Sequence, residues 1–209
     1  MDHTKTAVDV FDQRAEIYAA KFMETSTYHD SFNQFCNALR LKADVLELAC
    51  GPGNITKYLL SVRPDLRLVA TDLSPNMLAI AGRNNPRATC RIMDCRNVAV
   101  EPITYDGVLC GFGLPYLSKE EAVKLIADVS CILKREGVFY ICTMEDDYSK
   151  SGIEKSSQGD EVYMHYHEED YLVEAILRNG LKVLHMQRVD YRGDNGVKTT
   201  DLIIIAGKQ

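Results

Sequence analysis

The residues best suited to chemistry in this chain surround a glycine turn, VLELACGPGN, at residues 45–54. A buried-strand run ends there and breaks into two glycines that flank a proline. Glycine lets a backbone come close to a ligand, because it has no Cβ in the way. Glu47 lies just before the turn, and two further acids, Asp72 and Asp94, end the next two strand-like runs. The turn and the three carboxylates together indicate a ligand site.

A nucleoside triphosphate is the first ligand to test against this turn. A P-loop requires GxxxxGK followed by Ser or Thr, so that backbone amides surround the phosphates and the hydroxyl reaches magnesium. From Gly51 the chain reads GPGNITKY, with Thr56 at the second glycine and Tyr58 at the Ser or Thr. The spacing therefore disfavours a triphosphate.

A dinucleotide fits the turn better. Its fingerprint is GxGxxG after a strand, with an acid about 20 residues later that binds the ribose. Gly51, Gly53 and Asp72 meet this pattern, but Thr56 occupies the third glycine, which normally allows close packing of helix on strand. An NAD-linked oxidoreductase therefore remains one alternative.

The elements that position these residues follow from the hydrophobic pattern. Strand-like runs are predicted at 44–49, 66–72, 88–94, 105–111 and 138–143. Helical stretches separate these runs, which is typical of parallel strands joined by helical crossovers. Because parallel strands end at one edge of the sheet, Asp72 and Asp94 should share a ligand there.

Different patterns flank this alternating core. Residues 1–40 read as helical, because apolar residues recur at spacings of three and four, and a second helix is predicted over 28–39. A polar segment, 144–166, precedes a helix near 168–179. Two final strand-like runs flank RGDNG, and an Asn-Gly pair between strands is a strong hairpin signal. The sheet should therefore finish antiparallel.

The glycine turn resembles motif I of the class I S-adenosylmethionine-dependent methyltransferases, an acidic residue followed by xGxGxG. Glu47 holds the acidic position, and Gly51 and Gly53 hold the second and third glycines. Ala49 stands at the first glycine, so we expect the backbone there to avoid positive φ.

Two downstream stretches support the resemblance. VATDLSPNML resembles motif II, whose acid, here Asp72, accepts hydrogen bonds from both ribose hydroxyls. RIMDCRN resembles the next motif, whose acid, here Asp94, meets the adenine amino group, while the amide at Cys95 faces the ring. The resemblance covers residues 43–209 and implies S-adenosyl-L-methionine as cofactor and S-adenosyl-L-homocysteine as product. The cofactor-binding residues that we predict are Tyr18, Glu47, Ala49, Gly51, Gly53, Asn54, Asp72, Leu73, Met77, Asp94, Cys95 and Gly111.

The same resemblance implies an α/β fold. We expect a Rossmann-like seven-stranded sheet, mostly parallel with a C-terminal antiparallel hairpin, helices on both faces and an N-terminal helical lid. The carboxylates also suit a sulfonium cation, since hydrogen bonds to charged groups contribute about 1.5–3 kcal/mol each.

The methyl acceptor must meet the segment after the fourth strand, which reads GFGLPYL. Methyltransferases acting on planar amino groups of DNA or protein usually carry Asn or Asp there, then Pro-Pro and an aromatic residue. Pro115 and Tyr116 match this pattern, whereas Gly113 and Leu114 do not. The net charge of −6 also gives no general attraction to a phosphate backbone. We therefore expect a small-molecule substrate and no nucleic acid.

Aromatic residues are the other candidates around the acceptor. FDQRAEIYAAKF resembles the lid helix of small-molecule methyltransferases such as the ubiquinone- and menaquinone-biosynthesis methylases, in which an aromatic residue at the Tyr18 position often closes over the cofactor. Tyr18 fits equally well on the apolar face of its own helix. The predicted substrate residues are Tyr28, Tyr116 and Tyr163.

Two histidines in EVYMHYHEEDYL are candidates for a general base. His165 and His167 fall on one side of an alternating stretch, and histidine changes its charge near neutral pH. The alternative is a solvated strand face, with His167 starting the next helix.

Composition limits the number of domains and the kinds of protein that the chain can be. At 209 residues, with 46% hydrophobic and 26% charged, the chain suits one globular domain with a substantial core. No apolar run approaches the ~18 residues of a spanning helix, and the N-terminus lacks a secretory signal. Cys90 and Cys95, the closest cysteine pair, lack CxxC spacing and a second pair, so no metal is predicted. We expect a cytoplasmic protein with reduced thiols and no membrane span.

We divide this single domain into a helical lid (1–42), a cofactor-binding half (43–143), a substrate-side insert (144–166) and a helix with the terminal hairpin (167–209). The predicted function is methyl transfer to a small molecule by in-line displacement, with the protein acting mainly by positioning. A non-catalytic cofactor-binding module is the second alternative. The chemistry of the acceptor atom, the need for a base and the oligomeric state stay open.

Overall fold

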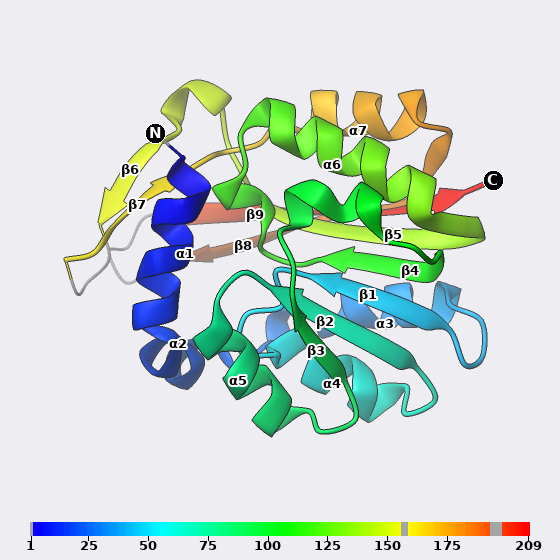
Figure 1. Ribbon diagram of the computed structural model, residues 1–209. Helices are drawn as coiled ribbons and strands as arrows, with labels where there is room; N and C mark the ends of the chain where they lie inside the picture. Colours follow the sequence, from blue (N-terminus) through cyan, green and yellow to red (C-terminus); the bar gives the residue numbers. More distant parts are fainter. Residues whose placement is uncertain (1, 156–158, 193–197) are drawn as a thin grey trace.

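A seven-stranded sheet runs through the middle of the computed structural model, which describes residues 2–155, 159–192 and 198–209 (Figure 1). The strand order is β3-β2-β1-β4-β5-β9-β8. The first five are parallel, whereas β9 runs antiparallel to both β5 and β8. The strands are β1 (Asp44–Leu48), β2 (Arg67–Asp72), β3 (Thr89–Ile92), β4 (Tyr105–Cys110), β5 (Leu133–Glu145), β8 (Leu181–Arg192) and β9 (Lys198–Lys208).

Helices cover both faces of this sheet (Figure 1). One face packs against α3 (His29–Ala38), α4 (Asn54–Val62) and α5 (Pro75–Asn84). The other face packs against α6 (Lys119–Ile132) and α7 (Glu169–Arg178). The predicted α/β fold, with its mostly parallel sheet and antiparallel finish, is confirmed. The predicted Asn-Gly turn lies outside the described residues.

Local sequence signals fix where two of these helices begin. The Ser74 hydroxyl accepts a hydrogen bond from the Met77 amide at 3.0 Å, so Ser74 caps α5 ahead of Pro75. Ser118 and Glu121 form a reciprocal capping box at the start of α6. Both helices start where the sequence predicts.

The N-terminal segment crosses the sheet at the carboxyl ends of the parallel strands (Figure 1). It consists of α1 (His3–Gln13), α2 (Ala15–Phe22) and the short 3₁₀ turn η1 (Ser26–Tyr28). The Asp12 carboxylate accepts hydrogen bonds from the Ser74 hydroxyl at 2.6 Å and the Asn76 amide at 2.9 Å. These bonds attach the end of α1 to the start of α5.

The polar stretch after β5 forms a small sheet of its own. Strands β6 (Gly152–Lys155) and β7 (Glu161–Met164) pair antiparallel, beyond the 3₁₀ turn η4 (Tyr148–Lys150). Helix α1 packs against β7, where the ring of His3 stacks on Tyr163 at 4.3 Å between centroids.

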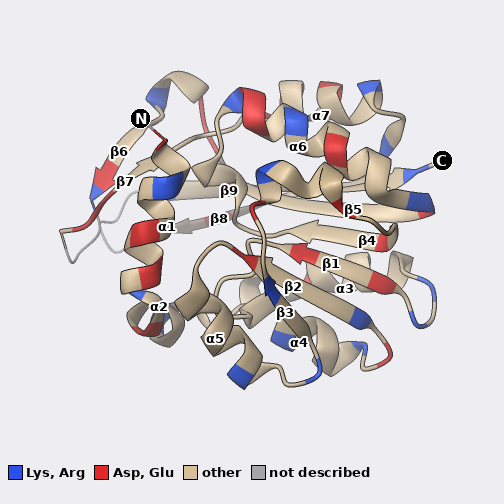
Figure 2. Ribbon diagram, in the orientation of Figure 1, with Lys and Arg blue, Asp and Glu red and all other residues tan. Residues whose placement is uncertain are grey.

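Charged residues are spread along the chain over many elements (Figure 2). Basic residues do not gather on any single helix or strand in this view. Across the described ranges, no helix combines the length and apolar character needed to cross a bilayer.

Candidate active site

The turn between β1 and α4 has an unusual backbone. Ala49, Gly51 and Gly53 all have left-handed φ, at 51°, 53° and 78°. The expectation that Ala49 avoids positive φ is therefore wrong. The turn is held in this form by β2, because the Cys50 amide donates to the Thr71 carbonyl at 2.9 Å. An alanine in this region stores about 1–3 kcal/mol of strain, and such strain is common at ligand sites.

The two glycines of the turn serve different purposes. A Cβ on Gly53 would lie 2.4 Å from Asn85 Nδ2 and 3.1 Å from the Ala81 Cα, so Gly53 is needed for α4 and α5 to pack. A Cβ on Gly51 would meet nothing within 4 Å, and Gly51 lines a cavity. Gly51 therefore leaves open space in front of the turn.

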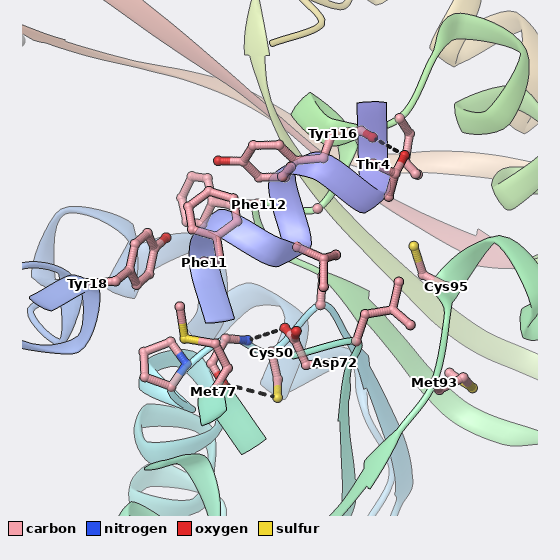
Figure 3. Close-up of a pocket in the computed structure, with 18 of the residues that line it drawn as sticks. Thr4, Phe11, Tyr18, Cys50, Asp72, Met77, Met93, Cys95, Phe112 and Tyr116 are labelled. Carbon is pink, nitrogen blue, oxygen red and sulfur yellow. Dashed lines mark hydrogen bonds between the residues drawn. The ribbon is translucent and has the colours of Figure 1, made fainter. Parts of the chain in front are cut away.

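Asp72 ends β2 at the wall of this cavity (Figure 3). One carboxylate oxygen accepts a hydrogen bond from the Gly51 amide at 2.8 Å, and the other accepts from the Ser74 amide at 2.9 Å. Burial raises the pKa of this carboxyl group, and the two amide bonds oppose that shift. Each oxygen keeps accepting capacity, so Asp72 can bind a further donor from the cavity.

Glu47 lies beneath the turn and not in the cavity wall. Its side chain is buried, and one oxygen accepts a hydrogen bond from the Thr56 hydroxyl at 2.5 Å. The other oxygen has no partner among the described residues. Burial raises the pKa of Glu47 to about 8, since the charged form has lost its hydration. Glu47 therefore supports the turn from below.

Asp94 is engaged by a neighbouring cation. It accepts hydrogen bonds from the Arg96 guanidinium at 3.0 and 2.7 Å and from the Arg96 amide at 2.9 Å. The same guanidinium contacts Asp2 and Glu121, each at 3.2 Å. Asp94 does not line the cavity, whereas its neighbours Met93 and Cys95 do. Sequence reasoning misses the role of Arg96, because two of its three carboxylate partners, Asp2 and Glu121, are far away in the chain.

Four aromatic rings form one side of the cavity, away from Met93 and Cys95 (Figure 3). Phe11 packs edge-on against Tyr18 at 5.5 Å and against Tyr116 at 4.9 Å between centroids. Phe112, which follows β4, completes the group. Phe11 and Phe112 are absent from the sequence prediction, although the Phe11 position follows from the helical spacing of Thr4, Ala7, Val8 and Phe11, which all face the cavity.

The structure thus brings together nine of the predicted site residues. Those lining the cavity are Tyr18, Ala49, Gly51, Asn54, Asp72, Leu73, Met77, Cys95 and Tyr116. Those outside its wall are Tyr28, Glu47, Gly53, Asp94, Gly111, Tyr163, His165 and His167.

The two predicted histidines, His165 and His167, bond to other segments of the fold. His167 is fully buried, with Nε2 2.8 Å from the Leu114 carbonyl oxygen and Nδ1 bonded to the Tyr171 hydroxyl. Burial lowers its pKa to about 4, so the ring is neutral and both nitrogens are occupied. Burial also lowers the pKa of His165, whose Nδ1 lies 3.3 Å from the Tyr148 hydroxyl. Neither ring lines the cavity, so the described contacts give neither histidine a position from which to act as a base there.

The two remaining tyrosines contact other parts of the fold. Tyr163 stacks on His3, outside the cavity wall. The Tyr28 hydroxyl donates to Asp201 at 2.6 Å, and the Tyr28 ring packs edge-on against Phe112 at 5.1 Å. Tyr28 therefore lies behind one of the rings that line the cavity.

The central part of the chain matches known proteins in sequence. Residues 45–137 match a family model described as a methyltransferase domain. An uncharacterized methyltransferase of Schizosaccharomyces pombe is 28% identical over 114 residues, which is 54% of this chain and 44% of the relative. A trans-aconitate 2-methyltransferase of Methylobacterium nodulans is 38% identical over 64 residues, 31% of this chain and 25% of the relative. The chain spans less than half the length of these curated relatives.

Solved structures share the whole fold at low sequence identity. A complex of DhpI with S-adenosylhomocysteine gives a TM-score of 0.72 at 20% identity, covering 98% of this chain and 96% of that one. Magnesium protoporphyrin IX methyltransferase from Synechocystis gives 0.74 at 14% identity, with all of both chains covered. The resemblance to class I methyltransferases predicted from motifs I and II is confirmed by the domain match and the fold.

Proposed function

We propose that this chain transfers a methyl group from S-adenosylmethionine to a small-molecule acceptor and releases S-adenosylhomocysteine. One observation carries the proposal: residues 49–52 of the left-handed turn and the Asp72 carboxylate form one wall of a cavity at the ends of β1 and β2. The match to a methyltransferase domain over 45–137 supports the same activity.

The residues present fit this cofactor. Gly51 leaves open space before the turn, and Asp72 would hold the ribose hydroxyls. Leu73, Met93 and Cys95 offer an apolar surface suited to a purine ring. Among the described residues of the wall, Asp72 is the sole charged side chain. A sulfonium cation suits such a wall, whereas the pyrophosphate of NAD would meet no Lys or Arg there.

Positioning is the main chemical task of the protein. When bound, the cofactor supplies an electrophilic methyl group whose leaving group is a neutral thioether. Helices α1 and α2 lie over the cavity, so they exclude water, and the rings of Phe11, Phe112 and Tyr116 hold the acceptor in line. Orientation of this kind replaces up to about 7–11 kcal/mol of a bimolecular barrier.

Two of the predicted acids act indirectly in this proposal. The Asp94–Arg96 pair fixes the backbone between Met93 and Cys95, which faces the cavity. Glu47 fixes the first turn of α4 through Thr56. Both are positioning residues.

The cavity wall does not suit the substrate named for the trans-aconitate relatives. Aconitate is an anion, and no basic side chain occurs among the described residues that line the cavity. A non-catalytic binding module remains the second candidate, because the cavity alone does not require turnover.

The test begins with thermal unfolding in the presence of three ligands. S-adenosylhomocysteine should raise the melting temperature, whereas NAD and ATP should not, because ligands that bind the native state stabilise it. A shift with NAD alone would overturn the proposal. Incubation with S-adenosylmethionine and a pool of small acceptors should then release S-adenosylhomocysteine, which a binding module would not do.

A further inference from the structure

Asp12, near the end of α1, is bonded to the first residues of α5. Its carboxylate accepts hydrogen bonds from the Ser74 hydroxyl at 2.6 Å, the Asn76 amide at 2.9 Å and the Asn76 side chain at 3.0 Å. The bonds from Ser74 and Asn76 lower the pKa of Asp12, so this carboxylate is charged at neutral pH. A negative charge is favourable there, because the first turn of a helix has unpaired amides and a positive dipole end. Asp12 therefore attaches α1 to α5 by charge-assisted hydrogen bonds.

Ser74 connects Asp12 to the acid proposed to hold the ribose. The Ser74 amide donates to Asp72 at 2.9 Å, while the Ser74 hydroxyl donates to Asp12. Ser74 is buried, whereas Asp12 is half-buried and Asn76 is exposed. The contact between α1 and α5 is therefore made at the rim of the cavity, two residues from Asp72, where water can replace it when α1 moves away.

Helices α1 and α2 rest on α5 through a small apolar cluster. Its buried members are Ala15, Ala19, Met77 and Ile80. This cluster is separate from the two larger clusters on the faces of the sheet. Segments with few buried apolar contacts open at a lower free energy than the whole protein unfolds. Helices α1 and α2 can therefore leave α5 without disturbing the sheet.

A different bond holds the far end of α2. The side chain of Asn54, which lines the cavity at the start of α4, donates to the Phe22 carbonyl at 2.8 Å. The backbone is then non-helical at residues 23–25, before η1 begins. This end of α2 can therefore stay attached, as a pivot, when the Asp12 contacts break.

Other polar contacts attach these helices to the cofactor-binding half less firmly. Ion pairs of α1 and α2 include Asp2–Arg96, Glu16–Arg83 and Arg14–Asp160. In the first two pairs the acid is exposed, so solvent weakens the pair. The third pair reaches the residue before β7 and not a cofactor strand. Loss of the Asp12 contacts should therefore release α1 from the cofactor-binding half most effectively.

We propose that α1 and α2 open and close over the cavity as one unit, and that Asp12 is the latch that sets how often they open. The inference rests on the proposed function, because S-adenosylhomocysteine is the ligand that is exchanged, and it assigns a positioning residue to that site. The partners of Asp12, Ser74 and Asn76, lie outside the cavity wall. Asp12 therefore stabilises the closed form equally with and without ligand.

This position predicts an unusual kinetic signature. A group that favours the closed form equally in the empty and the occupied protein slows both entry and exit of the ligand, and it leaves their ratio, the affinity, nearly unchanged. A side chain of the wall that touches the ligand acts differently, because its loss weakens affinity through faster dissociation. The two rate constants together therefore distinguish a latch from a binding residue.

The test measures both rate constants by surface plasmon resonance, with S-adenosylhomocysteine flowing over immobilised native protein or Asp12→Ala. Loss of the charge-assisted bonds should raise both association and dissociation rate constants about tenfold and change the dissociation constant by less than about threefold. Unchanged rate constants would overturn the proposal. Faster dissociation with an equal loss of affinity would also overturn it, because Asp12 would then belong to the binding wall.

Two further variants control for charge and for folding. Asp9→Ala removes the same charge from an exposed position of the same helix and should change neither rate constant. Asn76→Ala, also at an exposed position, keeps the backbone amide bond but removes the side-chain bonds to Asp12, so both rate constants should rise about threefold. If Asp12→Ala does not fold, unchanged rate constants in Asn76→Ala reject the latch.

Hydrogen exchange tests the latch without any ligand. Helices as short as α1 and α2 are marginal once they leave their neighbours, so their amides exchange when the pair opens. Amides of residues 3–22 should exchange about tenfold faster in Asp12→Ala than in native protein or Asp9→Ala, while β1 and β4 stay equally protected. Equal exchange in all three proteins would contradict the latch.

Failure of the latch is separable from failure of the proposed function. Binding of S-adenosylhomocysteine with unchanged rate constants in Asp12→Ala rejects the latch and leaves methyl transfer standing. Faster exchange of residues 3–22 in Asp12→Ala, in a protein that does not bind S-adenosylhomocysteine, supports the latch and rejects methyl transfer.

Discussion

Backbone amides that bond to β2 hold the cavity wall that β1 and β2 contribute. The other wall comes from α1, α2 and the segment after β4, and ring contacts join its parts together with one hydrogen bond, from the Thr4 hydroxyl to the Tyr116 carbonyl at 2.7 Å. On the first wall, the amides of Cys50, Gly51 and Ser74 bond to β2 residues. On the second wall, Phe11 joins Tyr18 and Tyr116 edge-to-face. The first wall therefore needs particular backbone angles, and the second needs volume and shape.

This difference predicts that the two walls respond differently to mutation. Changes in the turn should act on folding and on ligand binding in separable ways, because its glycines have separate roles. Changes in the aromatic wall should act mainly on how α1 and α2 close over the ligand.

Gly53→Ala should have the largest effect. The added Cβ would clash with Asn85 and the Ala81 backbone at a left-handed φ, so we expect about 2–4 kcal/mol of destabilisation in urea unfolding. Gly51→Ala has a similar φ but open space, and it should cost only about 1 kcal/mol while weakening S-adenosylhomocysteine binding. Equal destabilisation by both substitutions would contradict the division of roles.

Phe11→Ala tests the aromatic wall. Loss of two edge-to-face contacts, worth about 0.5–1.5 kcal/mol each, should loosen α1 and reduce affinity for S-adenosylhomocysteine by up to about tenfold. Ile17→Ala, on the exposed side of α2, is the control and should change neither affinity nor melting temperature. An unaltered affinity in Phe11→Ala would show that α1 does not cover the ligand.

Glu47→Gln tests the support beneath the turn through its pH dependence. The pKa of Glu47 is raised to about 8, so between the unfolded pKa near 4.5 and pH 8 the unfolded chain loses a proton that the folded protein keeps. Ionisation of this group therefore does not reduce the free energy of unfolding below pH 4.5. The free energy of unfolding falls as the pH rises towards 8, by at most about 1.4 kcal/mol per pH unit. Because Gln does not titrate, the melting temperature of the variant relative to the native protein should increase from pH 5 to pH 8. A constant difference across that range would be inconsistent with a buried, protonated Glu47.

Ala49→Gly should have the smallest effect, and a stabilising one. Glycine adopts φ near 50° without strain, so the free energy of unfolding should rise by up to about 1 kcal/mol, reduced by the greater freedom of glycine in the unfolded chain. Ala88→Gly, next to β3, is a control without positive φ and should destabilise slightly. A destabilised Ala49→Gly would mean that the Cβ of Ala49 makes contacts worth more than the strain.

The same contrast explains how much the sequence could predict. The turn, Asp72 and the Ser74 cap lie within 26 residues of one another, and their hydrogen bonds follow from local strand–turn–helix patterns. The alternation of strands and helices likewise predicts the parallel part of the sheet, and the Asn-Gly pair between the last two strand-like runs predicts its antiparallel end. The local sequence pattern is therefore sufficient to predict the wall formed by the turn after β1 and by Asp72. The exception is the sign of φ at Ala49, which the pairing of the turn with β2 imposes.

The aromatic wall depends on contacts between distant segments. Phe11 and Tyr116 are more than 100 residues apart, and nothing local marks Phe112 as a neighbour of Tyr28. Arg96 contacts Asp2 across 94 positions, so the contact that ties the N-terminus to the Asp94–Arg96 pair has no local signal. His167 is a residue type suited to base chemistry, but its burial and the bonding of both its nitrogens depend on Leu114 and on the packing of α7, which the local sequence does not show.

The central claim is that Asp72, at the end of β2, binds the ribose of S-adenosylmethionine directly. Calorimetric titration of S-adenosylhomocysteine into the native protein and Asp72→Ala tests it, with circular dichroism to establish that the variant is folded. Loss of charged hydrogen bonds worth about 1.5–3 kcal/mol should weaken affinity by roughly tenfold or more. Unchanged affinity in a folded Asp72→Ala protein would mean that Asp72 only holds the turn, and the account of this cavity would be wrong.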